Sequence, residues 1–362
     1  MKAGRSLVEL AQEITRQQDS KADYIVQSQA LTMTSHPADQ QWAQALGGSQ
    51  LAIGDVARAW ATDHTHSQLA QHLGIPATYY NRIRAEQPGL LDVNVNTLLR
   101  SRPTSERRMV RTLDNRARAF LSDKYRRLDN YDLLEVVLPE LQSVEGLRLE
   151  SCEVTDRRLY LKAVTNRVQG EVSLGQVVQA GVLITNSEIG MGTLAVQPMS
   201  FVLACLNGAV HDQYGQRRNH VGKAWANSDE EAERIFADDT LKAQDKAFYL
   251  TVRDTVRGAL SEALFGKILD DMREAAGVKL EGDPVKAVEV LAKKQGLNEA
   301  ERGGVLRHLI EGGSLTLWGM ANAITRAAQD VESYDRSTEL EMLGGQIITL
   351  PKSEWREIAA VK

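Results

Sequence analysis

The 362-residue chain has only two cysteines, Cys152 and Cys205, too few for a disulfide framework and too far apart for a CxxC metal pair. A chain with so few cysteines and no disulfide framework is typical of a reducing cytoplasm. Aromatic residues make up only 5% of the chain, so aliphatic side chains must form most of its core. The chain lacks 18 consecutive apolar residues, and its first residues lack the apolar core of a signal peptide. We therefore expect a protein of the bacterial cytoplasm without a membrane span.

Nucleotide-binding motifs are also missing. No GxxxxGK[ST] motif occurs, and no GxGxxG follows a predicted strand, so nucleotide hydrolysis and dinucleotide chemistry are not expected. Cys205, His211 and His220 do not have a standard zinc spacing and lack a fourth ligand. Cys205 lies in an apolar run and is expected to pack as a small hydrophobe. Together with Glu188 these residues leave an enzyme as an open alternative, but we predict no catalytic residue, no metal and no cofactor.

What the chain does have is an uneven distribution of charge. Between Arg100 and Arg127 ten Lys and Arg residues face three acids, a local sum of +7. The whole chain carries −5 at pH 7, so the other residues sum to −12. This reversal of sign indicates a surface that faces a polyanion, and nucleic acid is the first candidate.

We predict an α+β fold in three parts. Residues 1–99 carry −2 and are predicted to be mainly helical. Residues 100–227 are predicted to form a central antiparallel β-rich domain, built from hairpins with a packed helix. Residues 228–362 carry −7 and show helical apolar periodicity. Ser228 and Glu231 have the spacing of a capping box, which predicts the helix that begins this acidic C-terminal region.

Residues 64–86 resemble a helix-turn-helix. Gly74 would supply the turn between the two helices. A second helix that reads DNA would present Asn81, Arg82 and Arg84. The alternative is a plain helical hairpin, because the second helix is as apolar as it is polar.

The basic stretch predicts a β-hairpin over residues 107–122. Asp114 and Asn115 both tolerate the positive φ of a two-residue turn. That turn sets a register in which Arg111 lies opposite Arg118, and Met109 lies opposite Phe120. One face of the hairpin would then be basic, and the other would be apolar and face the core.

The pair of opposing arginines suggests an anionic ligand, because like charges across a strand pair destabilise it. Phe120 would offer a surface on which a base stacks. The predicted nucleic-acid-binding residues are Arg107, Arg111, Arg116, Arg118, Phe120, Lys124, Tyr125, Arg126 and Arg127. The alternative is that the arginines pair with acids, which residues 128–146 (−5) and the C-terminal region supply.

Residues 147–165 predict a second hairpin, and two long apolar runs follow it. Each run ends in a polar motif, rich in the glycine and asparagine that turns require. We expect these motifs to be structural; their residues are Asn186, Glu188, Asn207, Gly208 and His220.

Several long motifs resemble the DUF932 family of phage and plasmid-like proteins. They are QLAQHLGIPATYYNRI, LLDVNVNTLLR, RTLDNRARAFLSDKYRRLDNYDLLE, ITNSEIGMGTLAVQP, LACLNGAV and LWGMANAITRAAQD. The resemblance spans roughly residues 20–345. Ala209 departs from the methionine expected in many members. The resemblance implies a setting in a phage, prophage or plasmid and no established activity. The order of hairpin, helix and sheet is also similar to that of Rad52/RecT-like annealing proteins, an analogy of fold alone.

We therefore predict a nucleic-acid-binding protein whose favoured partner is single-stranded DNA. It would bind or anneal strands in replication, recombination or establishment of a mobile element, and we expect it to form a homo-oligomer. Two alternatives remain open. One is a duplex-binding regulator that uses residues 64–86, and the other is an interaction protein that inhibits a host-defence factor.

Overall fold

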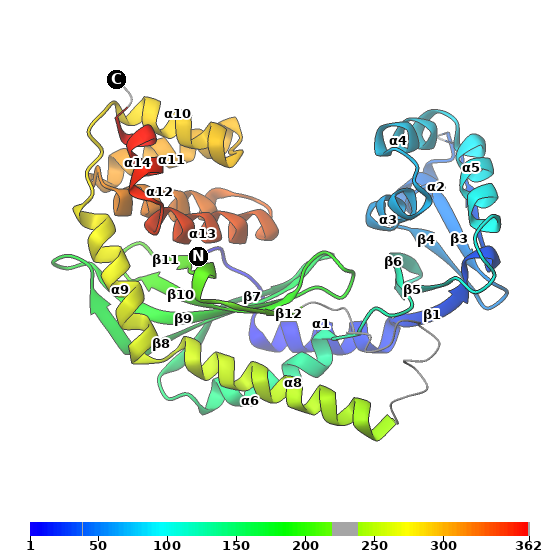
Figure 1. The fold of residues 1–362 in the computed structure, drawn as a ribbon, viewed down its shortest axis with the longest axis horizontal. Coiled ribbons are helices and arrows are strands. Elements are labelled where there is room, and N and C mark those ends of the chain that lie inside the picture. The colour runs from blue at the N-terminus through cyan, green and yellow to red at the C-terminus, as the bar shows by residue number, and fades with distance from the viewer. Residues whose placement is uncertain (38, 219–237, 361–362) are drawn as a thin grey trace.

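The computed structural model describes residues 1–37, 39–218 and 238–360. It shows the predicted mixture of helices and strands, with two six-stranded sheets and a helical C-terminal lobe. In Figure 1 the first sheet lies in the lobe at the right, and the second lies at the left beneath the C-terminal helices. His220 and the predicted capping box of Ser228 and Glu231 lie outside the described residues.

The first sheet combines N-terminal strands with the basic hairpin. Its strands run in the order β1-β5-β6-β4-β3-β2. The bounds are β1 (Ala22–Gln27), β2 (Leu31–Ser35), β3 (Ser49–Ile53), β4 (Ala57–Ala61), β5 (Arg107–Leu113) and β6 (Arg116–Ser122). The first sheet thus contains strands from both sides of the predicted boundary after residue 99. The sequence did not predict the four N-terminal strands, because they are short and lie among helices and so give little periodic signal.

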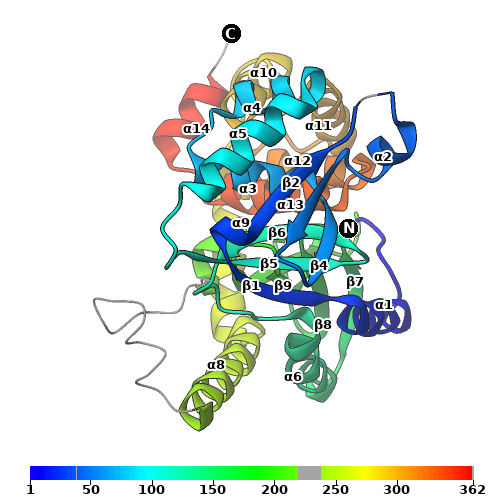
Figure 2. The same ribbon diagram turned by 90° about the vertical axis from the view of Figure 1, so that its right-hand side faces the viewer.

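Three helices cover one face of this sheet. They are α3 (Asp63–Leu73), α4 (Ala77–Glu86) and α5 (Pro88–Arg100), and they pack on Leu51, Ile53, Val110 and Phe120. A short helix, α2 (Gln41–Ala45), interrupts the connection between β2 and β3. Figure 2 shows α2 projecting from the side of the lobe.

The second sheet is antiparallel, in the order β11-β10-β9-β8-β7, with β12 also pairing with β10. The bounds are β7 (Leu147–Val154), β8 (Leu159–Glu171), β9 (Val177–Asn186), β10 (Leu194–Val202), β11 (Asn207–Val210) and β12 (Gln216–Arg218). This confirms the predicted hairpin over residues 147–165. All of β10 and nearly all of β9 are buried, because helices cover both faces of the sheet.

Different helices cover the two faces of the second sheet (Figure 1). On one face α1 (Leu7–Ser20), α6 (Asn130–Ser143) and α8 (Asp238–Ala259) enclose a core of aliphatic residues. On the other face lie helices of the C-terminal lobe, whose bounds are α9 (Glu262–Gly277), α10 (Pro284–Gln295), α11 (Glu299–Gly312), α12 (Leu317–Asp330), α13 (Tyr334–Ile348) and α14 (Lys352–Ala359). None of the described helices combines the length and the apolar character needed to cross a lipid bilayer.

The residues before α1 are held by distant parts of the chain. Arg5 forms an isolated antiparallel bridge with Cys152 at the edge of β7. The ammonium of Lys2 donates to the carbonyl oxygen of Val331 at 2.8 Å. This segment therefore ties the edge of the second sheet to the C-terminal lobe.

Candidate nucleic-acid interface

The basic hairpin forms as predicted at its turn. Asp114 and Asn115 have φ angles of 50° and 61°, and Leu113 lies opposite Arg116. The Asp114 carboxylate accepts hydrogen bonds from Arg16 at 2.8 Å and Ser20 at 2.6 Å. The turn therefore docks on the end of α1.

Beyond the turn the predicted register is wrong, because β6 contains a bulge. Thr112 lies opposite Ala117 and Arg111 lies opposite Ala119, so Arg118 is the extra residue. One extra residue reverses which side chains face the core. Phe120 therefore points toward α3 and α5 and is buried, instead of standing beside the arginines. The bulge is fixed by the backbone N–H of Phe120, which donates to the side chain of Gln68 on α3 at 2.7 Å.

Arg111 is fully buried in an ionic network and offers no surface to a ligand. Its guanidinium donates to Asp23 at 2.8 Å, to Asp129 at 2.6 Å and to the carbonyl oxygen of Glu188 at 2.8 Å. Lys21 is a further partner of Asp129. A buried charge is stable only when it is paired and hydrogen-bonded, and these contacts meet that condition.

The network holds the carboxylate of Asp129 ionised. Burial opposes the negative charge of Asp129, but Arg111 and Lys21 outweigh it and keep the pKa of Asp129 below its ordinary value. Burial likewise opposes the charge of Arg111, while Asp129 and Asp23 raise its pKa. For Arg111 the structure therefore shows the alternative, in which the arginine pairs with acids. One of these acids, Asp129, belongs to residues 128–146.

Glu188 joins the two sheets. One carboxylate oxygen accepts from Arg118 at 2.6 Å, and the other accepts from the backbone N–H of Asn130 at 2.7 Å. The amide of Asn186 donates to the side chain of Asn130 at 2.9 Å. The predicted structural role of this polar motif fits these contacts, and what sequence reasoning missed is that its partners lie on the basic hairpin.

The neighbouring residues of this loop complete the junction. His64 and Gln68 on α3 both bond the carbonyl oxygen of Ile189, at 2.8 Å and 3.1 Å. The hydroxyl of Tyr125 donates to the carbonyl oxygen of Ser187 at 3.1 Å, and burial raises the pKa of that phenol. Tyr125, predicted to contact nucleic acid, therefore contacts this loop instead.

Part of the predicted basic strip remains at the surface. Arg107, Lys124 and Arg127 are exposed, and Arg116 and Arg126 are half-buried. Lys124 follows the end of β6, where the backbone N–H of Tyr125 donates to Ser122 at 3.0 Å. We call Arg107, Lys124, Arg126 and Arg127 the basic ridge.

Within the basic ridge, Arg107 lies on the face of the first sheet that α3, α4 and α5 leave open. Arg107 pairs with Gln27 of β1, and both are exposed. Ile25, two residues before Gln27 and so on the same face, is 37% exposed. Asp23, the acid on this face of β1, is largely buried against Arg111. The ridge is therefore a mixed basic and apolar surface whose nearest acid on β1 is already neutralised.

The helix-turn-helix-like segment forms α3, a turn and α4. Gly74 ends α3 in the left-handed conformation, with φ 70°. Buried His66 and Tyr80 join the helices through a 2.8 Å hydrogen bond. On α4 the exposed residues include Thr78, Asn81 and Arg82, whereas Arg84 is half-buried and paired with Asp63 at 2.8 Å.

The residues weighed for catalysis do not come together. His211 is fully buried, its Nε2 lies 2.9 Å from Ser200 Oγ, and burial lowers its pKa to about 3. Its Nδ1 has no hydrogen-bond partner among the described residues, so the pair lacks the carboxylate of a catalytic triad. Cys205 packs against the core of the C-terminal lobe. Within the described residues no three His, Cys, Asp or Glu side chains are grouped to hold a metal ion.

The polar motif at Asn207 and Gly208 connects β11 of the second sheet to α12. The amide of Asn207 donates to Asn322 at 3.2 Å and also to Thr325, both on α12. A Cβ added at Gly208 would lie 3.0 Å from the sulfur of Met1. These contacts fit the structural role predicted for Asn207 and Gly208.

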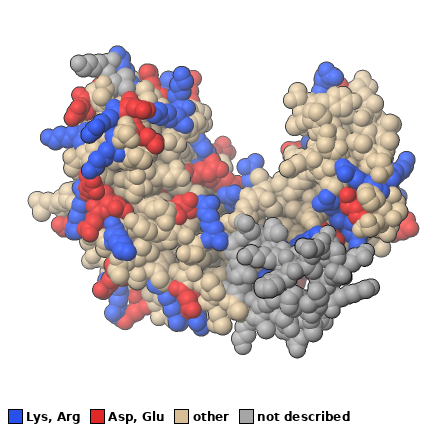
Figure 3. All heavy atoms as spheres, in the orientation of Figure 1, with Lys and Arg blue, Asp and Glu red and all other residues tan. Residues whose placement is uncertain are grey.

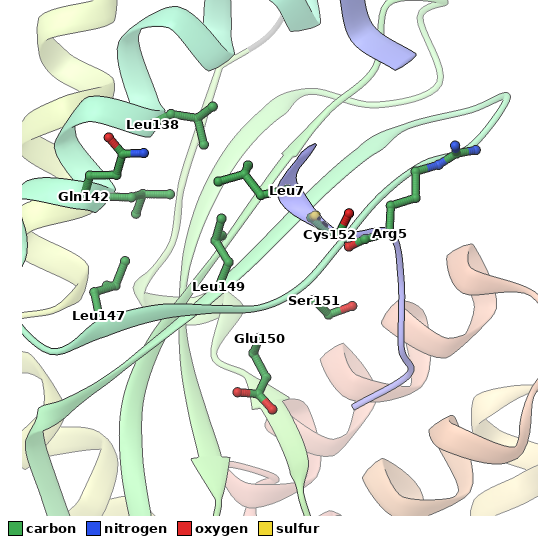
Figure 4. Close-up of a pocket in the computed structure, with 11 residues that line it drawn as sticks. Arg5, Leu7, Leu138, Gln142, Leu147, Leu149, Glu150, Ser151 and Cys152 are labelled. Carbon is green, nitrogen blue, oxygen red and sulfur yellow. Dashed lines mark hydrogen bonds between the residues drawn. The ribbon is translucent and has the colours of Figure 1, made fainter. Parts of the chain in front are cut away.

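A cavity of about 310 Å³ lies between α6, β7 and the residues before α1. Figure 4 shows Leu7, Leu138, Leu147 and Leu149 on its apolar wall, to which Leu141 also belongs. The thiol of Cys152 borders it, donates to the carbonyl oxygen of Arg5 at 3.1 Å, and has a pKa that burial raises to about 11. That thiol is protonated at neutral pH and is a poor nucleophile. The cavity contains none of the predicted site residues.

Comparison of the chain with models of protein families, with curated proteins and with solved structures finds no match. The resemblance to the DUF932 family stays a prediction from the sequence motifs. Function must therefore be argued from the geometry of the chain itself.

Proposed function

We propose that this protein binds nucleic acid, with single-stranded DNA favoured, through the basic ridge. The observation that carries the proposal is the exposure of Arg107, Lys124 and Arg127 beside an open sheet face. Arginine suits this role, because its guanidinium contacts phosphate in two places. Ile25, exposed on the same face, adds apolar surface against which a sugar or base can lie.

The proposal assigns Arg111, Arg118, Tyr125 and Phe120 a supporting role. Arg111, Arg118 and Tyr125 hold the sheet against the loop around Glu188. Phe120 packs in the core on the other face of the sheet, and all four keep the exposed residues in place. Figure 3 shows a hollow between the C-terminal helices and the first sheet, whose walls are mostly uncharged on that face. The ridge therefore suits a polyanion better than this hollow does.

The biological setting follows from the sequence motifs alone. Their resemblance to phage and plasmid-like proteins supports a role in replication, recombination or establishment of a mobile element in the bacterial cytoplasm. Annealing of strands and assembly into homo-oligomers rest on the analogy with Rad52/RecT-like proteins.

A binding experiment tests the ridge. The variant Arg107→Ala/Lys124→Ala/Arg127→Ala should bind labelled oligothymidine at least about tenfold more weakly than the parent at low salt. Each lost phosphate contact should also lower the slope of log affinity against log salt by about 0.7.

The matched control removes the same charge elsewhere. Arg273, Arg302 and Lys352 have side chains 44–69% exposed in the C-terminal lobe. Their triple alanine variant should keep both the affinity and the salt slope. Equal losses of affinity in the two variants would mean that net charge alone drives binding. If the ridge variant lost no affinity, the proposal would be wrong.

Duplex recognition by α4 is a second candidate, favoured by the exposure of Asn81 and Arg82 after a glycine turn. Selection of binding sites from random duplexes should then yield a motif that Asn81→Ala/Arg82→Ala abolishes while the ridge variant keeps it.

Displacement of any bound strand by all polyanions alike, without nucleotide preference, would instead favour a basic surface that meets an acidic host protein.

A further inference from the structure

Three aromatic rings meet on the first sheet at β4, which is separated from β5 by β6. The ring centroids of His36, Trp42 and Trp60 lie 5.2–5.8 Å apart. Trp60 lies on β4 next to Ala59, which packs in the core under α3–α5. Successive side chains of a strand alternate, so Trp60 faces the opposite, open side of the sheet. We call these three residues the aromatic platform.

The platform exposes one ring and buries another. Trp42, on the projecting helix α2 (Figure 2), is 60% exposed, whereas Trp60 beneath it is 5% exposed. Leu46, four residues after Trp42, is also 38% exposed. Tryptophan contributes most when its large ring is buried, so a ligand that covers this supported but open ring gains contact area.

His36 adds a polar atom to the platform. Its Nδ1 lies 3.1 Å from Gln40 Oε1, but its buried Nε2 has no hydrogen-bond partner among the described residues. A buried polar atom without a partner destabilises the fold by about as much as a lost hydrogen bond. A ligand with donors and acceptors at its edge would therefore suit this site better than a purely apolar one.

The charges around the platform favour an anion. Arg58 lies two residues before Trp60 on the same strand face and is exposed. Arg116, paired with Trp60 across β4 and β6, is half-buried, and its Nη2 would lie 3.7 Å from a Cβ at Gly47. Asp39 is an exposed acid in the segment before α2. Asp63 also acts on Arg116, but it is paired with Arg84. Arg58 is therefore the exposed basic group on the strand face of the platform.

We propose that the aromatic platform stacks an unpaired base of a single strand on Trp42, with Arg58 contacting the adjoining phosphate. This rests on the proposed function and adds the kind of contact involved: the ridge binds phosphates, whereas the platform binds bases. Every base has a flat face, so such stacking requires no particular sequence. It also distinguishes a single strand from a duplex, whose bases are already stacked.

The experiment compares oligothymidine with an abasic oligomer of the same length. The parent protein should prefer the oligothymidine, and Trp42→Ala should lose at least about fivefold in affinity for it with no loss for the abasic strand. Its salt slope should stay unchanged, because stacking releases no counterions. Trp42→Phe should keep most of the preference, and the quenching of tryptophan fluorescence that oligothymidine causes in the parent should shrink in this variant.

Leu46→Ala is the matched control, since it removes an exposed apolar side chain from the same place and should keep the base preference. Unchanged binding of oligothymidine by Trp42→Ala, while the parent retains its salt-dependent binding, would overturn the platform and leave the ridge standing. Equal losses in Trp42→Ala and Leu46→Ala, for both strands, would show that the surface serves another apolar partner. A parent that binds neither strand would remove the proposed function and this inference together.

Discussion

At the residue scale, the most consequential side chain is Arg111. The sequence places it in a basic run that favours a ligand, yet it is fully buried between Asp23 and Asp129. Its main contribution is to avoid a penalty: Lys21 and Arg127 also approach these carboxylates, but Arg111 is the fully buried cation that lies between both.

Arg111→Ala should therefore destabilise the protein by about 3–5 kcal/mol, since it removes the buried partner of a hydrogen-bonded ion-pair network. Urea denaturation followed by circular dichroism measures the change. Arg107→Ala, in the same strand but exposed, should change the free energy of unfolding by no more than about 0.5 kcal/mol. Similar values for the two variants would contradict the buried network.

At the element scale, the two-residue turn and both strands of the hairpin follow from Asp114 and Asn115, because their backbone preferences are local. The bulge at Arg118 does not, since it depends on Gln68 of α3 and Glu188 of the other sheet. Local signals therefore predict the element, and contacts made only after folding decide which face it shows.

The same contrast applies to the candidate site. Arg107 was predicted to face a ligand, and it is exposed. Phe120 was predicted to stand on the same face, but it is buried in the core on the other side of the sheet. The sequence did hint at the partner Asp129 through the acidic segment 128–146. It gave no comparable hint of Asp23, because a single acid in a short strand looks like any surface charge.

Gly74 offers an element-scale prediction. With φ 70° and no atom within 4 Å of an added Cβ, Gly74→Ala should cost about 1 kcal/mol through backbone strain alone. Gly303 lies inside α11 with equal space, and Gly303→Ala should stabilise by about 0.5–1 kcal/mol because alanine favours helix. Thermal unfolding of the two variants should shift in opposite directions, and a shift in the same direction would argue against the glycine turn.

At the scale of the whole molecule, two lobes are joined by a loop that is rich in hydrogen bonds, and each lobe contains a buried histidine. His66 lies on α3 and bonds Tyr80 of α4, and His211 follows β11 and bonds Ser200 of β10 in the second sheet. Burial lowers the pKa of each to about 3. Both imidazoles are therefore neutral in the folded protein near neutral pH.

The stability of the protein should fall as the pH drops from 6.5 toward 3. The unfolded chain binds a proton at each imidazole below about pH 6.5, whereas the folded chain does so only near pH 3. Each histidine thus removes up to about 1.4 kcal/mol per pH unit in that window. Urea unfolding of His66→Gln and His211→Gln across pH 7 to 4.5 should give a shallower decline in each, with the two effects adding in the double variant. If stability declined with falling pH as steeply in the variants as in the parent, the two histidines would not be the cause of the decline.

The bond between Lys2 and Val331 spans 329 positions, and it has a consequence for synthesis. At 5–20 residues per second, roughly 15–65 s separate the synthesis of Lys2 from that of Val331. During that time the residues before α1 can pair with Cys152 as soon as β7 has been made, but they lack their partner in the C-terminal lobe. The edge of the second sheet can therefore be covered long before the C-terminal lobe is tied to it.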